Sequence, residues 1–312
     1  MDITVVGAGV VGLTVALVLE EQGHRVRIVA DAPTHAITSS VAGAVWLPYR
    51  VGPPAAVAAW GARTLAWLEE IASDRAAGVD VLTGYEITPD AGPSAPRPWW
   101  DPRDAARPLV RTAVPVSGAP IAWRFVAPRA EPRLHLAWLA ARLRAPIELR
   151  TVTALEREPG DAVIHCTGIG ARTLVGDTTV EPLFGQTVIT EPGTVDLGIT
   201  ITDNRDPAGI FYVIPRRAEL VLGGCSLPWP PGAPPVADAA ITDRILAQAA
   251  RLGVRHGTVR AVRVGLRPYR PEVRLERDPI ESRVIHCYGH GGAGYTLARG
   301  CAEDVAALVT AA

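Results

Sequence analysis

A glycine turn between a strand and a helix, within residues 1–31, restricts the fold of this chain more than any other feature. The β-branched run Ile3–Val6 predicts a strand, glycines follow at positions 7, 9 and 12, and the apolar spacing of Leu13–Leu19 predicts an amphipathic helix. A second strand is expected over His24–Ala30, and Asp31 follows it. Strand, glycine turn, helix, strand and acid in this order predict a dinucleotide-binding βαβ unit.

Each glycine of this turn has a separate physical role in such a unit. Gly7 permits the sharp turn, Gly9 lets a pyrophosphate approach the backbone, and Gly12 lets the helix pack closely on the strand. The anion then sits on free amides at the helix N-terminus, and Asp31 or a group near it meets a ribose hydroxyl. The alternative is a βαβ unit whose glycines serve packing alone, and the pattern does not decide which dinucleotide binds.

Composition and charge favour an ordinary globular enzyme. The chain has 312 residues, of which 48% are hydrophobic and 20% are charged, and its net charge is -1. A net charge so close to zero does not indicate the excess of positive charge that would attract nucleic acid or an anionic membrane, so we expect neither partner. No signal peptide and no apolar run of transmembrane length is evident, and a cytoplasmic location is the expectation.

The cysteines give no sign of a metal centre. Cys166, Cys225, Cys287 and Cys301 are scattered along the chain and form no Cys-x-x-Cys motif. We expect no metal and buried, reduced thiols, while a pair that meets in space stays open.

Later strands predict that the nucleotide fold is discontinuous. The apolar run Asp161–Gly170 resembles a buried parallel strand ending at Thr167 and Gly168, where ligands gather in such sheets. Strands over Leu183–Thr190, Ile210–Pro215 and Glu219–Gly224 have hairpin spacing. The expected fold class is α/β, a discontinuous Rossmann-like dinucleotide-binding domain with an inserted, mainly antiparallel α+β substrate domain. We expect the first domain at 1–46, 129–176 and 268–312, and the second, which also carries interface surfaces, at 47–128 and 177–267.

The chain resembles the D-amino-acid oxidase family of flavoproteins in motifs that follow the family order from end to end. They are Val5–Leu13, Val41–Tyr49, Cys166–Gly168, Gly185–Gln186, Tyr212–Pro215, Leu222–Gly224, Gly265–Pro271 and Val284–Gly294. The resemblance implies FAD as cofactor and oxidative deamination of a D-amino acid by hydride transfer from its α-carbon to the flavin. Oxygen then reoxidises the flavin to give hydrogen peroxide, and the resemblance leaves a homodimer possible.

The resemblance also assigns three residues to the reaction. Arg267 grips the substrate carboxylate, and its planar two-donor fork suits that group better than a lysine would. Tyr212 adds a hydrogen bond to the same carboxylate, and the Gly292 carbonyl accepts from the substrate amine. His290 is expected to be a structural member of its turn rather than a general base. The implied FAD contacts are Gly7, Ala8, Gly9, Val10, Val11, Gly12, Asp31, Thr38, Ser39, Gly43, Ala44, Val45, Val152, Thr167, Gly168, Gly289, Gly291, Gly292, Ala293, Gly294, Tyr295 and Thr296.

The residues at the expected side-chain pocket favour neutral substrates. Val45 and Leu47 are apolar, and a carboxylate buried against them without a partner would be costly. D-aspartate oxidases need an additional cation for the substrate side chain. Cys225 and Ser226 follow Gly224, where we would look for such an arginine, and this weakens the D-aspartate alternative. Arg205 keeps it open. A glycine or sarcosine oxidase is a further alternative. A non-catalytic dinucleotide-binding protein and a nicotinamide dehydrogenase are others, which Arg267 and the C-terminal glycine turn disfavour.

Overall fold

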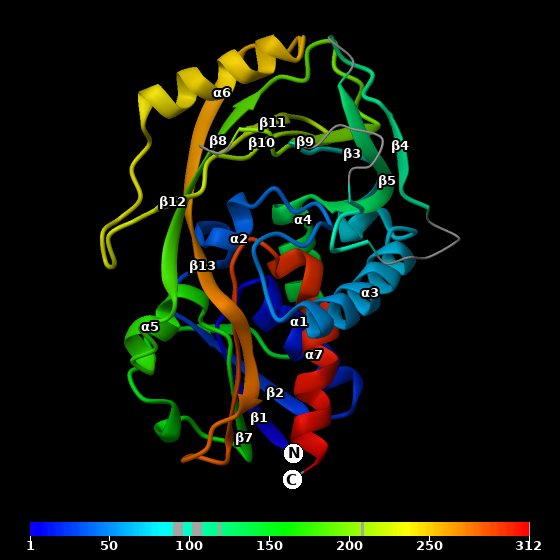
Figure 1. Cartoon of the computed structure of the whole chain (residues 1–312). Coiled ribbons are helices and arrows are strands. Elements are labelled where there is room, and N and C mark those ends of the chain that lie inside the picture. Colours follow the sequence, from blue (N-terminus) through cyan, green and yellow to red (C-terminus); the bar gives the residue numbers. More distant parts are fainter. Residues whose placement is uncertain (90–95, 102–107, 118–119, 207–208, 312) are drawn as a thin grey trace. The chain divides into compact units, whose positions relative to one another are not determined.

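The computed structural model describes residues 1–89, 96–101, 108–117, 120–206 and 209–311 (Figure 1). Contacts within the chain divide it into two compact units. The first unit comprises Met1–Asp80, Ala130–Pro182 and Arg267–Ala312, and the second comprises Val81–Arg129 and Leu183–Leu266. The chain therefore leaves the first unit and returns to it twice.

A largely parallel sheet forms the centre of the first unit. Its strand order is β13-β14-β7-β1-β2-β6. The four pairings from β14 to β6 are parallel, whereas the second half of β13 pairs with β14 in antiparallel register. Val5 of β1 and Ile164 of β7 are fully buried, as expected for parallel strands covered on both faces. The strands are β1 (Asp2–Val6), β2 (Arg25–Ala30), β6 (Ile147–Leu149), β7 (Ala162–His165), β13 (Val259–Arg277) and β14 (Val284–His290).

Helices in the first unit cover this sheet with apolar side chains. Helix α1 packs against α7, which in turn packs against α3. Leu13 and Leu19 of α1 and Val305 of α7 are fully buried, and each such side chain contributes about 1.5–3 kcal/mol of burial free energy. The helices are α1 (Val10–Glu21), α2 (Thr38–Val41), α3 (Pro54–Ile71), α4 (Pro132–Arg142), α5 (Ala171–Leu174) and α7 (Gly294–Thr310), with short 3-10 turns at Thr34–Ala36, Arg75–Ala77, Leu155–Arg157 and Gly168–Gly170.

Residues 47–80, which we expected in the substrate domain, cluster with the first unit. The reason is the packing of α3 against α7. Trp60 Nε1 donates to Asp304 Oδ2 at 2.6 Å, and the amide of Gly300 donates to Thr64 Oγ1 at 3.0 Å. A Cβ atom at Gly300 would lie 2.3 Å from the carbonyl oxygen of Trp60, so the two helices approach at backbone distance.

The second unit is built on a mainly antiparallel sheet with α6 packed on one face. Its strand order is β4-β5-β3-β9-β10-β11-β8-β13, β12 pairs with β8, and β3 with β9 is a parallel pair. Strands β10 and β11 form the hairpin that the sequence predicted. Ile245 of α6 and Leu252, directly after it, pack with Phe211 and Leu222 in one apolar core. The elements are β3 (Val79–Ile87), β4 (Val110–Ala113), β5 (Ile121–Ala130), β8 (Glu181–Thr190), β9 (Ile199–Asp203), β10 (Phe211–Pro215), β11 (Leu220–Gly223), β12 (Leu227–Pro228) and α6 (Ala239–Arg251).

These two sheets, one mostly parallel and one mostly antiparallel, match the predicted fold class. Among the helices of the described residues, none combines the length and the apolar character needed to cross a bilayer.

Candidate functional site

The turn between β1 and α1 is packed at backbone distance. Gly7 has a φ of +114°, and a Cβ atom there would lie 2.3 Å from the carbonyl oxygen of Cys166. A Cβ atom at Gly12 would lie 1.9 Å from the carbonyl oxygen of Gly7. No side chain fits at either position. The sequence pattern is therefore a steric requirement of this turn.

The N-terminus of α1 is open to an anion. Gly9 is the N-cap residue and provides no side-chain cap, and the first turn contains no acidic residue. The amide of Val10 donates to Ser39 Oγ at 3.1 Å, which brings the predicted loop residue Ser39 to the same helix end. Asp31 directly follows β2 and is exposed. Unsatisfied amides and the helix dipole together attract a phosphate group at such a terminus.

The predicted loop from Thr38 to Leu47 is fastened to the start of α7. The hydroxyl of Tyr295 donates to the carbonyl oxygen of Ser39 at 3.0 Å. Thr296 Oγ1 bonds to both the amide and the carbonyl oxygen of Leu47, each at 3.2 Å. The hydroxyls of Tyr295 and Thr296, both predicted to contact the cofactor, thus hold this loop, along which Gly43, Ala44 and Val45 lie.

Two further predicted residues follow the carboxyl end of β7. Gly168 has a φ of +57°, and a Cβ atom there would lie 3.6 Å from the ring of Pro268. Thr167 Oγ1 lies 2.7 Å from Nε2 of His165. Val152, by contrast, packs against an apolar cluster that includes Val6.

A second glycine turn joins β14 to α7. Gly289 and Gly291 have φ values of +87° and +53°. The amide of Gly291 donates to the carbonyl oxygen of Pro268 at 2.9 Å, which ties the turn to β13. Helix α7 starts at Gly294 after an N-cap, Ala293, that gives no side-chain hydrogen bond. A Cβ atom at Gly294 would lie 3.4 Å from Val10 Cγ1, so the two glycine turns adjoin.

Arg267 and Gly292, two of the three residues assigned to the reaction, lie together in the first unit. A Cβ atom at Gly292 would lie 3.6 Å from Cδ and 3.8 Å from Nε of Arg267. The same atom would lie 3.0 Å from Cδ1 of Tyr49. Tyr49 was part of a motif in the sequence but had no role assigned. Its neighbour Arg50 lies near its ring, with the guanidinium carbon 5.6 Å from the ring centre.

Tyr212, the third residue, belongs to the second unit, where it lies over the end of the neighbouring strand. Tyr212 pairs with Gly223 across β10 and β11. A Cβ atom at Gly223 would lie 2.2 Å from the tyrosine ring, and one at Gly224 would lie 2.9 Å from its hydroxyl. Arg244 of α6 donates to the carbonyl oxygen of Gly224 at 2.6 Å. Gly223 and Gly224 therefore form the surface against which the Tyr212 ring packs.

A buried chain of polar side chains, missed in the sequence, lies beneath Thr167. Nε2 of His286 lies 2.9 Å from Oδ2 of Asp278, and its Nδ1 lies 3.0 Å from Nδ1 of His165. With both rings neutral, one order of protons satisfies every contact: Thr167 donates to His165, His165 to His286, and His286 to Asp278. Burial lowers the pKa of His165 to about 3 and also lowers the pKa of His286, which keeps both neutral. Because Thr167 donates its hydroxyl proton to His165, its oxygen can still accept a hydrogen bond from another group.

The residues of the first unit fit the groups of an FAD molecule. Two helix N-termini without side-chain caps or acidic first turns adjoin, and glycine backbone lines the approach to the first. The exposed carboxylate of Asp31 at the end of β2 suits a ribose hydroxyl. A pyrophosphate requires such donors, and the absence of a side chain at the N-cap residue Gly9 lets it approach them.

Comparisons with known proteins agree with this geometry. The D-amino-acid oxidase of Rubrobacter xylanophilus is 42% identical over 99% of this chain and 95% of its own length. The D-amino-acid oxidase of Streptomyces coelicolor is 39% identical over 99% of this chain and 97% of its own length. Human D-aspartate oxidase is 31% identical over 99% of this chain and 94% of its own length.

Solved structures share the fold. Glycine oxidase from Bacillus cereus superposes with a TM-score of 0.79 at 20% identity, covering 99% of this chain and 95% of that one. The profile of the FAD-dependent oxidoreductase family matches residues 2–308. The chain therefore belongs to the family of FAD-dependent oxidoreductases.

Proposed function

We propose that this protein is a D-amino-acid oxidase, which converts D-amino acids and oxygen to imino acids and hydrogen peroxide. The imino acids hydrolyse to 2-oxo acids and ammonia. The two relatives with that name, at 42% and 39% identity over nearly the whole chain, support this reaction. The observation that carries it is the position of the Arg267 side chain against Gly292, because the two groups suit the two ends of an amino acid.

In this proposal, Arg267 and Gly292 bind and orient the substrate, which is an amino-acid zwitterion. The guanidinium of Arg267 offers two parallel donors to the α-carboxylate. The carbonyl oxygen of Gly292 accepts from the α-amine. FAD, when bound, accepts the hydride from the α-carbon and passes the electrons to oxygen. No nucleophile or general base is needed from the chain in this scheme, so positioning is its main contribution.

FAD would be held by residues of the first unit alone. The amides of Gly9, Val11 and Gly12 would bind the pyrophosphate, and Asp31 would bind a ribose. The amides around Gly291 and Gly294, at the start of α7, would stabilise negative charge on the cofactor.

The side-chain preference that we propose is for neutral D-amino acids. Val45 and Leu47, on the loop held by Thr296, offer apolar contacts. Arg205, the residue that kept an acidic substrate open, has both carboxylate oxygens of Asp203 within hydrogen-bond distance, at 2.9 Å and 2.6 Å. A guanidinium already neutralised in this way is a poor partner for a substrate carboxylate. D-Aspartate oxidation remains the alternative because the human relative carries that name.

The test is a substrate panel combined with an arginine variant. The purified holoenzyme should produce hydrogen peroxide from D-alanine and D-valine, little from D-aspartate, and none from L-amino acids, glycine or sarcosine. Arg267→Ala should keep its FAD and lose at least about 100-fold in kcat/KM, because the carboxylate would lose its paired charge. Arg267→Lys should recover only part of that loss, since an ammonium cannot form the two-donor fork.

Arg260→Ala provides a matched control on the same strand. Arg260 is exposed and pairs with Glu191, so its removal should leave kcat/KM unchanged. Peroxide from glycine or sarcosine at rates matching D-alanine would instead favour a glycine or sarcosine oxidase. An active Arg267→Ala variant would refute the role of this side chain.

A further inference from the structure

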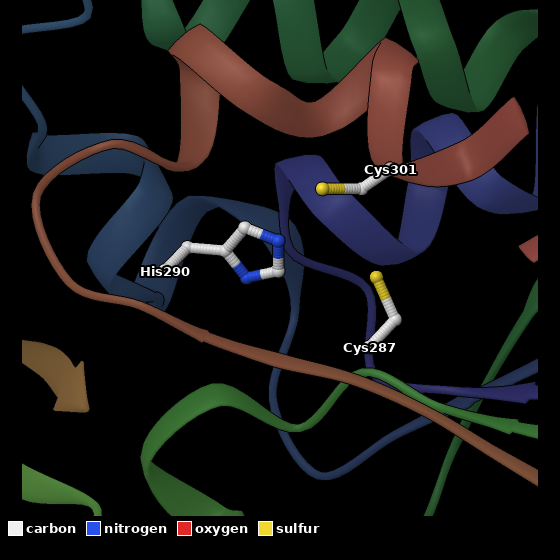
Figure 2. Close-up of side chains that lie close together, drawn as sticks. All are labelled: Cys287, His290 and Cys301. Carbon is white, nitrogen blue, oxygen red and sulfur yellow. The ribbon is translucent and has the colours of Figure 1, made fainter. Parts of the chain in front are cut away.

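Three buried side chains with soft-metal ligand atoms meet between β14 and α7. Cys287 and His290 come from β14 and Cys301 comes from α7, and their ligand atoms all lie within 4.8 Å of one another (Figure 2). Cys301 is 0% exposed, Cys287 is 1% and His290 is 4%. The spacing Cys-x2-His-x10-Cys is set by the strand, the glycine turn and the helix together. It was not apparent from the sequence.

A fourth ligand is close at hand. The thiol of Cys166, at the end of β7, hydrogen-bonds with the thiol of Cys287. One further cysteine, Cys166, therefore adjoins the three side chains whose ligand atoms all lie within 4.8 Å of one another.

The imidazole of His290 gives independent support for a ligand. Its Nε2 atom is buried and has no well-formed hydrogen bond to any of the residues that the structure describes. Figure 2 shows a ring nitrogen turned toward the sulfur atoms of Cys287 and Cys301. A buried nitrogen without a partner is costly, and a disulfide between the two cysteines would leave it so. A metal ion would use the nitrogen and both sulfurs at once.

We propose that Cys287, His290 and Cys301 bind a thiophilic tetrahedral cation, with Zn²⁺ as the best fit and Cys166 as the fourth ligand. Sulfur and imidazole ligands of this number are typical of closed structural zinc sites. Binding replaces the thiol protons, which are released to solvent, by bonds from sulfur to the metal. The thiolates of Cys287 and Cys301 offset the charge of the ion, and Cys166 as a third thiolate would give the site one net negative charge, as in other zinc sites with three cysteines and one histidine.

The position of the site suggests a structural role. Cys287 and His290 precede the glycine turn that leads into α7, while the carbonyl of Cys166 lies against Gly7 of the other glycine turn. A metal here would tie β7, β14 and α7 together directly below both turns. The inference is independent of which substrate the enzyme oxidises.

The experiment measures metal content in the holoenzyme. Because the site is fully buried, protein should be expressed in zinc-replete and zinc-depleted media and analysed by elemental mass spectrometry. We expect about one zinc ion per chain in the first preparation and a higher melting temperature than in the second. X-ray absorption should show zinc–sulfur distances of about 2.3 Å and a zinc–nitrogen distance of about 2.0 Å.

Variants separate this site from adventitious binding. Cys287→Ser and Cys301→Ser should each lower the zinc content at least about ten-fold, and His290→Asn should do so even if a serine variant fails to fold. Cys166→Ser should show a smaller loss. Cys225→Ser is the matched control, because Cys225 is a buried cysteine of the second unit whose thiol donates to the carbonyl oxygen of Phe184. It should keep its zinc. Flavin absorbance and circular dichroism verify folding in each case.

Three results would overturn the proposal. Zinc far below one equivalent in the folded wild-type protein from zinc-replete medium would do so. Equal zinc content in wild type and in folded Cys287→Ser would also do so. A mass lower by two hydrogen atoms, with a Cys287–Cys301 crosslinked peptide, would show that the pair forms a disulfide instead.

Discussion

Both glycine turns of the first unit join a strand to a helix, but different groups lie next to their glycines. In the turn from β1 to α1, Cβ atoms at Gly7 and Gly12 would collide with backbone, at 2.3 Å and 1.9 Å. In the turn from β14 to α7, a Cβ atom at Gly292 would meet side chains, with Cδ1 of Tyr49 at 3.0 Å and Cδ of Arg267 at 3.6 Å. Backbone cannot move aside as a side chain can. The first turn is therefore fixed at Gly7 and Gly12, whereas the second can change its specificity at Gly292 by changing the neighbouring side chains.

This difference explains why a dinucleotide site and a substrate site place different demands on a sequence. A pyrophosphate is common to many cofactors, and a rigid backbone surface suffices to bind it. A substrate is selected by side chains whose positions depend on packing partners. Substitutions in the two turns should therefore separate loss of FAD from loss of substrate binding.

The largest effect is expected from alanine at the third glycine of the first turn. Gly12→Ala places a methyl group 1.9 Å from the carbonyl oxygen of Gly7, and we expect about 3 kcal/mol of destabilisation or more and loss of FAD. The matched substitution in the second turn, Gly294→Ala, meets Val10 Cγ1 at 3.4 Å, an ordinary contact. It should retain FAD. The ratio of flavin to protein absorbance measures both, and equal FAD loss in the two variants would contradict the comparison.

The sequence predicted the first turn well because its constraints are local. The roles of Gly7, Gly9 and Gly12 follow from backbone geometry that any chain of this pattern must adopt. The parallel strands and the β10–β11 hairpin were also predicted, since their apolar runs and spacing are local signals. The packing of α3 against α7 was not, because the contact of Trp60 with Asp304 joins residues far apart in the chain.

The candidate site was predictable only in part, for the same reason. The resemblance named Arg267 and Gly292, and the structure places them side by side. No sequence pattern marked Tyr49 as their neighbour. His165 and His286 lie 121 positions apart and meet only because β7 pairs with β14. The cluster of Cys287, His290 and Cys301 likewise needs the fold to bring strand and helix together.

Acidification should destabilise the fold around β7 and β14, the strands next to the two glycine turns. Since burial lowers the pKa of His165 to about 3 and lowers that of His286, the unfolded chain binds more protons below the ordinary histidine pKa of 6.5. Stability should therefore fall as the pH drops from about 7 to 5, by up to about 1.4 kcal/mol per pH unit for each proton. Thermal unfolding followed by flavin release and by circular dichroism should shift together, because β14 leads into the second turn and Cys166, directly after β7, lies against Gly7 of the first.

Two glutamine variants test whether these histidines cause the pH dependence. His165→Gln and His286→Gln remove one titrating group each, so each should flatten the slope of melting temperature against pH in this range. His256→Gln is the control, because His256 lies in the second unit, partly exposed, and its ring bonds to a backbone carbonyl. The neighbouring carboxylate of Asp278 interferes little, since the amide donor at Glu281 and the His286 ring lower its pKa to about 2. An unchanged slope in both variants would refute the assignment.

The smallest effect is expected where a side chain can adjust, at the turn that binds substrate. Gly292→Ala would place its methyl group 3.0 Å from Tyr49, which must shift by a few tenths of an ångström, and in ordinary contact with Arg267 at 3.6 Å. A shift of this size at a positioning residue should raise KM for a D-amino acid about ten-fold while FAD content and stability stay near wild type. Steady-state kinetics beside the flavin-to-protein ratio measure both quantities. Tyr49→Leu in the same background should relieve the crowding and recover part of the KM. If Gly292→Ala instead lost FAD as Gly12→Ala does, the second turn would be as rigid as the first, and the contrast between them would fail.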